Sequence, residues 1–224
     1  MLSFNPIQNA LKMCVRKQIA SEKTDIYQSV ARRLLSDSTK QRANAIGLTS
    51  ASSGEGVTTV ATRLAMSAAK TAGRPVLLVD CNREHPGVEQ AFGLTASSGL
   101  CDALSGRKEL AECLRSTKIP NLAVLGLGGK MRGNDIAQWE GSLAEITDAF
   151  ALVLLDMPSA GEVIAQPIPL DTLDGMLLVV EAERTRRKAV VRAKSQLERV
   201  QAEVLGVILN KRKKHVPDWL YELI

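Results

Sequence analysis

The sequence predicts an α/β fold, a doubly wound and mostly parallel sheet, from three observations. Short continuous apolar runs alternate with segments of helical periodicity, which is typical of parallel strands covered on both faces. A glycine loop follows the first apolar run and opens a helix, and two later apolar runs end directly on an aspartate. The chain has 224 residues, 45% of them hydrophobic, which is enough for one substantial domain of this kind.

Apolar runs predict six strands, at 45–50, 75–80, 122–127, 151–156, 175–181 and 204–210. Helical spacing between them predicts helices over 58–71, 100–115, 135–149 and 184–201. Ahead of the first strand, two more helices are expected over 7–20 and 24–36, the second capped by Thr24 or Asp25. We therefore expect three parts: an N-terminal helical extension (1–40), the α/β domain (41–215) and a C-terminal tail (216–224).

The loop at 51–59 has the features of a phosphate-binding loop. Gly54 and Gly56 let the backbone turn tightly and approach a ligand, and N–H groups at the start of the next helix can then bind phosphate oxygens. Thr58 stands where the hydroxyl of such a loop binds Mg²⁺, but Val57 stands where the motif has a lysine that reaches the phosphates. The motif therefore predicts a P-loop NTPase fold with a deviant Walker A sequence.

The two strand-end aspartates are Asp80 and Asp156, each preceded by four apolar residues. This is the Walker B arrangement, which places a carboxylate where it can hold Mg²⁺ directly or through water. In an open α/β sheet, ligands bind beyond the carboxyl ends of the strands, so both aspartates are expected beside the glycine loop.

The net charge of +5 is unevenly distributed, because residues 183–214 hold eleven Lys and Arg against three Glu. Such a face can meet an anionic membrane, nucleic acid or an acidic partner, or it is a solvated helix surface. The absence of interleaved aromatic residues argues against a platform for single-stranded nucleic acid. The four cysteines form no Cys-x-x-Cys pair, no apolar run approaches the ~18–20 residues of a membrane span, and no secretory h-region is present, so a cytoplasmic location is expected.

The order of these motifs resembles the cytoplasmic domain of the bacterial tyrosine kinases (BY-kinases), which serve capsule and exopolysaccharide export and are related to ParA/MinD-type ATPases. The resemblance covers roughly residues 22–215. It rests on Gly-Glu-Gly at 54–56, Asp-x-x-Arg-x-x-Pro at 80–86, Asp-x-Pro at 156–158 and Leu-Gly-Val-x-Leu-Asn at 205–210, with Gly-Leu at 99–100 between them.

By position, the resemblance implies that ATP or ADP with Mg²⁺ is the cofactor and that Asn210 lies near the adenine. The residues implied to bind the phosphates are Ser53, Gly54, Glu55, Gly56, Val57, Thr58 and Thr59. The implied Mg²⁺ ligands are Thr58, Asp80 and Asp156. The implied catalytic residues are Asp80, Asn82, which replaces the second acid of the family motif, and Arg83.

The departures from the family pattern concern catalysis and assembly. Besides Val57 and Asn82, Ser159 replaces a proline, and the ring-forming motif would fall on Asp25, Gln28 and Ala31, without its two arginines. The C-terminal tyrosine cluster is absent, since Tyr27 and Tyr221 are the only tyrosines in the sequence. We expect weakened nucleotide binding and a monomer or homodimer rather than a large ring.

The resulting hypothesis is a pseudokinase or pseudo-ATPase that regulates polysaccharide synthesis and export by docking on the cytoplasmic tail of a membrane-anchored co-polymerase. One alternative is an active ATP-dependent tyrosine autokinase that borrows a cation from Arg83 or from the basic run 211–214. Another is a ParA/MinD-type positioning protein bound to membrane or DNA, although nucleic acid is not the expected partner.

Overall fold

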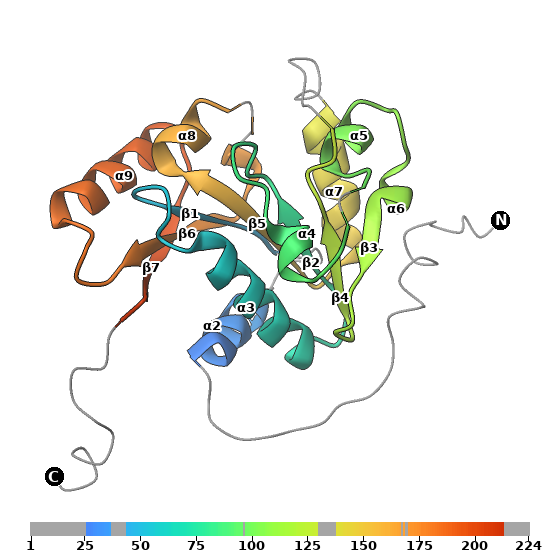
Figure 1. The fold of residues 1–224 in the computed structure, drawn as a ribbon, viewed down its shortest axis with the longest axis horizontal. Coiled ribbons are helices and arrows are strands. Elements are labelled where there is room, and N and C mark those ends of the chain that lie inside the picture. The colour runs from blue at the N-terminus through green and yellow to red at the C-terminus, as the bar shows by residue number, and fades with distance from the viewer. Residues whose placement is uncertain are drawn as a thin grey trace, which may run out of the picture.

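Within the described residues, seven strands form one sheet in the order β3-β4-β2-β5-β1-β6-β7 (Figure 1). The structure, a computed structural model, describes residues 26–36, 44–95, 97–129, 138–166, 168 and 170–212. The strands are β1 (Asn44–Ser50), β2 (Val76–Asp80), β3 (Leu114–Ser116), β4 (Leu122–Leu125), β5 (Leu152–Ser159), β6 (Gly175–Glu181) and β7 (Val204–Asn210). All neighbouring strands run parallel except β3, which pairs antiparallel with β4 at one edge.

Helices cover both faces of the sheet. The helices are α2 (Ile26–Ser36), α3 (Val57–Thr71), α4 (Val88–Ala91), α5 (Leu100–Leu104), α6 (Leu110–Cys113), α7 (Trp139–Ala149), α8 (Ala160–Ile164) and α9 (Arg187–Arg199), with a 3-10 turn, η3 (Leu170–Thr172). One apolar core joins α2, α3 and α4 to the sheet, and a second joins α5 to α9 to its other face. The predicted doubly wound architecture is therefore confirmed.

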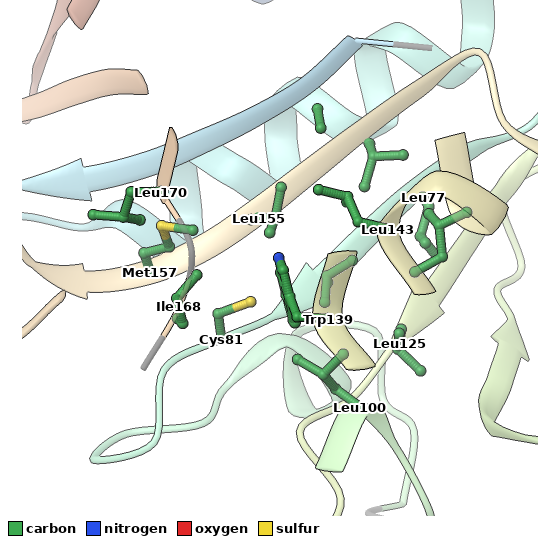
Figure 2. Close-up of a cluster of buried hydrophobic side chains, with 14 of the residues drawn as sticks. Leu77, Cys81, Leu100, Leu125, Trp139, Leu143, Leu155, Met157, Ile168 and Leu170 are labelled. Carbon is green, nitrogen blue, oxygen red and sulfur yellow. The ribbon is translucent and has the colours of Figure 1, made fainter. Parts of the chain in front are cut away.

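The second core shows why continuous apolar runs were the correct signal for strands. All residues from Leu152 to Met157 of β5 are buried, because helices pack on both faces of this central strand. Figure 2 shows side chains of α7, among them Trp139 and Leu143, gathered around Leu155 together with Cys81. Cys81 is buried, as expected of a small apolar residue at this point.

The prediction of one helix over 100–115 is wrong. Gly106 adopts a left-handed conformation (φ 67°) after α5 has ended, and a short second helix, α6, follows. Leu114–Ser116 then pairs with β4 as an edge strand, because it finds an unpaired neighbour there. Helical spacing alone could not reveal this tertiary pairing.

The topology brings the functional loops to one edge of the sheet. β1 lies between β5 and β6, and the chain goes from β1 across to β2 on one side but reaches β6 on the other. This is a topological switch point, where the loops after neighbouring strands diverge and leave room for a ligand. The loops after β1, β2 and β5 all leave from the carboxyl ends of parallel strands, as the sequence predicted.

Candidate nucleotide and magnesium site

The loop between β1 and α3 is shaped by two glycines with positive φ. Gly54 has φ 83°, and Gly56 has φ 91° and forms the N-terminal cap of α3. A side chain is strained in this region of backbone conformation, so both positions favour glycine. Ser52, Ser53 and Gly54 are exposed, and the first turn of the 15-residue helix α3 follows directly. The arrangement is a helix N-terminus open to an anion.

Glu55 holds this loop together from inside the protein. Its side chain is buried, with 3% of the residue exposed. One carboxylate oxygen accepts hydrogen bonds from the N–H groups of Ala51 (2.9 Å) and Ser52 (3.3 Å), and the other accepts from the Thr185 hydroxyl. The Glu55 side chain is thus a structural brace of the loop, although the sequence placed Glu55 among the residues around the phosphates.

Two residues at the end of β7 contact the loop from outside. The Asn210 amide Nδ2 donates to the carbonyl of Glu55 (2.9 Å), and Lys211 Nζ donates to the carbonyl of Gly54 (2.7 Å). Lys211 Nζ also lies 2.9 Å from the carboxylate of Glu181, at the end of β6. The hydrogen bond from Lys211 is the main reason why the pKa of Glu181 lies below its usual value. Partial burial opposes this lowering, and the positive charges of Lys211 and Arg184 add to it.

Val57 does not contribute a polar group to the loop. It is the first residue of α3, is 9% exposed, and packs into the core formed by α2, α3 and the sheet. The position that the motif gives to a lysine is therefore occupied by an aliphatic core residue.

Asp156 is fully buried within β5, which continues to Ser159, and it pairs in register with Asp80 of β2 and Leu48 of β1. Neither carboxylate oxygen has a hydrogen-bond partner of normal geometry among the described residues. Burial raises the pKa of Asp156 to about 7; the nearby Thr58 hydroxyl acts against this rise, and the Asp80 carboxylate adds to it. A buried carboxylate without a partner is costly unless it is neutralised by a proton or a cation.

The Thr58 hydroxyl and the Asp156 carboxylate fit Mg²⁺. Mg²⁺ binds one or two protein oxygens and completes its shell with waters and phosphate oxygens, so the Thr58 hydroxyl and the Asp156 carboxylate suffice as protein ligands. Among the described residues, no group of three or more His, Cys, Asp or Glu side chains could hold a metal by itself. A site of this type therefore needs the phosphates of a nucleotide to complete it.

Asp80 has a different environment from its register partner Asp156: it ends β2, whereas β5 continues past Asp156 to Ser159. The Asp80 carboxylate accepts hydrogen bonds from the N–H groups of Asn82 (3.0 Å), Gly87 (2.9 Å) and Val88 (3.0 Å). Burial raises its pKa, and these three bonds oppose the rise. Asp80 thus shapes the loop between β2 and α4, and its role as a metal ligand or catalytic group stays a prediction.

The other candidate residues lie in or near the same loops. The side-chain oxygen of Asn82 accepts a hydrogen bond from the N–H of His85 (3.0 Å), and Arg83 is exposed. Thr59 is exposed at the start of α3, and Ser159 ends β5 and forms the N-terminal cap of α8. The catalytic roles of Asn82 and Arg83 stay predictions. Several residues named from the sequence lie outside the described residues, namely Thr24, Asp25, Lys213, Lys214 and Tyr221.

The sequence analysis missed the supports of the loop, Glu181 and Thr185. A signal for them was present, because Glu55 puts an acid inside a loop expected to bind anions. Such an acid is tolerable only when its charge is turned away and bound elsewhere.

Comparisons with known proteins place the chain in a family. It is 32% identical to the tyrosine-protein kinase CpsD of Streptococcus agalactiae over 202 residues, which cover 88% of this chain and 86% of that protein. It is 28% identical to the tyrosine-protein kinase YwqD of Bacillus subtilis over 211 residues, covering 92% and 87%. No family model matches the chain.

Solved structures agree. The crystal structure of the chimerical protein CapA2B2 matches with a TM-score of 0.73 and 26% identity over 92% of this chain and 91% of that one. MinD of Pyrococcus horikoshii, solved with Mg-ADP, shares the fold, with a TM-score of 0.64 and 20% identity over 81% and 77%. The fold is thus that of the P-loop proteins related to MinD, and the chain belongs to the bacterial tyrosine-protein kinases represented by CpsD and YwqD.

Proposed function

We propose that this chain is a nucleotide-binding member of the bacterial tyrosine kinases that has lost phosphoryl transfer and regulates capsule or exopolysaccharide synthesis and export. One observation carries the proposal. A loop already shaped for phosphate lies beside the buried carboxylate of Asp156, whose oxygens have no hydrogen-bond partner of normal geometry among the described residues, yet the position of the motif's lysine is an aliphatic core residue.

Binding and catalysis depend on the missing lysine to different degrees. A hydrogen bond to a charged group contributes roughly 1.5–3 kcal/mol, so losing it weakens binding about 10–150-fold. Backbone N–H groups of the loop, and Mg²⁺ held by Thr58 and Asp156, would still contribute to binding. When bound, Mg²⁺ would neutralise phosphate charge. Transfer requires positive charge where the transition state develops negative charge, and that requirement is not met at Val57.

The proposal also includes a membrane-anchored partner and a cytoplasmic location at the inner face of the membrane. Within the described residues, no helix is long and apolar enough to cross a bilayer. The exposed side of α9 is rich in basic residues, and the edge strand β7 exposes apolar side chains, both of which suit a docking role. We propose that the partner is the cytoplasmic tail of a polysaccharide co-polymerase.

An active autokinase is the second candidate, since the structure brings the cation of Lys211 to the loop. Measuring ATP turnover and phosphotyrosine formation separates the two, with Thr58→Ala as the control that removes the Mg²⁺ hydroxyl. We expect Mg²⁺–ATP to bind with no turnover above the Thr58→Ala level. Turnover clearly above that level in the purified native chain would show that phosphoryl transfer has been retained.

A further inference from the structure

We propose that Lys211, at the end of β7, takes over the loop-holding and cationic role that the P-loop motif gives to the residue at Val57. The inference rests on the proposed function only in that nucleotide binds this site. It assigns the missing charge to a residue more than 150 positions away in the sequence.

Lys211 contacts the phosphate loop directly. Lys211 Nζ donates to the main-chain carbonyl of Gly54, one of the two glycines with positive φ that shape the loop. Lys211 itself has φ 55°, an uncommon conformation for a lysine, at the point where β7 ends. The chain therefore turns sharply after the strand, and the lysine side chain reaches back to the loop.

The same contact places positive charge at the loop. The Gly54 carbonyl directly precedes Glu55, Gly56 and the first turn of α3, whose N–H groups are suited to bind phosphate. An ammonium at this place attracts a phosphate bound to the loop. An ammonium has three donors, and the Gly54 carbonyl and the Glu181 carboxylate account for two.

The neighbouring Asn210 fixes how the end of β7 packs against the loop. Its amide bonds the carbonyl of Glu55, and a Cβ added at Gly56 would lie 2.4 Å from the amide nitrogen and 3.7 Å from Lys211 Cε. Asn210 and Lys211 thus pack closely against consecutive residues of the loop. A lysine anchored in this way approaches the phosphates without a large loss of side-chain freedom on binding.

Substituting Glu181 distinguishes two ways in which Lys211 could act on the site: through its positive charge, or only by holding the loop in place. The Glu181 carboxylate partly neutralises the ammonium, at 2.9 Å. If the charge of Lys211 matters, Glu181→Gln, which keeps an oxygen acceptor but removes the negative charge, strengthens binding of a di- or triphosphate. If Glu181 merely anchors Lys211 as a brace, the same substitution weakens binding.

The test is a calorimetric titration of the full chain with Mg²⁺–ADP. Lys211→Met is expected to weaken binding about 10–100-fold, Lys211→Arg to retain most of the affinity, and Glu181→Gln to tighten it. The matched control is Lys194→Met, because Lys194 is an exposed lysine paired with Glu198 on α9. Thermal unfolding of each variant identifies any that fails to fold.

A double-mutant cycle then asks whether Lys211 substitutes for the motif's lysine. Val57→Lys should restore more affinity in the Lys211→Met background than in the native chain, because a second lysine is then no longer redundant. Additive effects of the two substitutions, unchanged affinity in Lys211→Met, weaker binding in Glu181→Gln, or no nucleotide binding by the native chain would each overturn the inference. ATP turnover would instead contradict the proposed loss of catalysis and leave the role of Lys211 intact.

Discussion

At the scale of single residues, Asp156 combines complete burial with the absence of a partner of normal hydrogen-bond geometry among the described residues. Burial raises its pKa to about 7, far above the value of about 4 that it has in an unfolded chain. The folded state therefore holds a proton on Asp156 between about pH 4 and pH 7 that the unfolded state releases. The protonated form therefore stabilises the folded state fully below about pH 4, and this stabilisation is lost as the pH rises from about 4 to about 7.

We predict that Asp156→Asn raises the melting temperature of the metal-free protein at pH 8 but not at pH 5. At pH 8 the native carboxylate is buried and charged, and at about 1.4 kcal/mol per pKa unit the shift corresponds to a few kcal/mol. At pH 5 the native side chain is protonated and resembles the amide. Calorimetric unfolding with a chelator present measures both differences.

Mg²⁺ provides the control for this prediction. Added at pH 8 together with ADP, whose phosphates complete the site, Mg²⁺ should stabilise the native chain beyond the effect of ADP alone, and it should add no such stabilisation to Asp156→Asn. An Asp156→Asn variant destabilised equally at both pH values would instead show that the carboxylate serves packing rather than a cation.

At the scale of elements, the loop before α3 is held from both sides, by Glu55 within and by the end of β7 outside. Comparing substitutions at Gly54 and Gly56 separates two effects on nucleotide binding: backbone strain in the loop, and loss of the contact between the loop and β7. Both glycines have positive φ, but a Cβ at Gly54 would meet nothing within 4 Å, whereas one at Gly56 would collide with the Asn210 amide.

We predict that Gly56→Ala reduces Mg²⁺–ADP affinity at least tenfold more than Gly54→Ala does. Each substitution costs roughly 1–2 kcal/mol of backbone strain. Only Gly56→Ala also displaces Asn210 from the loop. Titration calorimetry on the two variants gives the comparison, and equal losses would mean that the contact with β7 does not shape the site.

Sequence patterns predicted the elements whose burial is dictated locally and missed those created by tertiary contact. The parallel strands and α3 followed from apolar runs and glycine spacing, and the structure confirms them. Asp80 ends β2 as predicted, but the prediction that Asp156 ends its strand is wrong, because β5 continues to Ser159. The edge strand β3 and the supports of the loop at Glu181 and Thr185 depend on partners distant in the chain. The different environments of Asp80 and Asp156 were equally invisible, since both end an apolar run and only the fold supplies N–H groups to one of them.

At the scale of the whole molecule, one edge of the sheet is left incompletely covered. Leu205, Val207 and Leu209 of β7 are 44%, 56% and 59% exposed. Val207 and Leu209 pair with Leu178 and Val180 of β6, whose side chains belong to the core on the α9 side of the sheet. The side chains of Val207 and Leu209 therefore project from the face of the sheet that the basic helix α9 covers.

This face fits an acidic amphipathic segment, and we predict that the tail of the proposed co-polymerase binds here. Apolar side chains of such a segment would cover Val207 and Leu209, and its acids would meet α9, which carries five Lys and Arg and one Glu. Leu209→Asp should weaken binding at least tenfold while leaving stability nearly unchanged, because an exposed side chain contributes little to the core.

The control is Ile26→Asp, which changes an apolar side chain that is 73% exposed on α2, in the helix layer on the other face of the sheet. Binding of the partner's cytoplasmic tail is measured by calorimetry at two salt concentrations. Binding to the basic face should weaken as salt rises, because the charges of α9 are exposed and screened. If Ile26→Asp lost binding and Leu209→Asp did not, the partner would dock on the α2 side. The basic helix would then be a solvated surface.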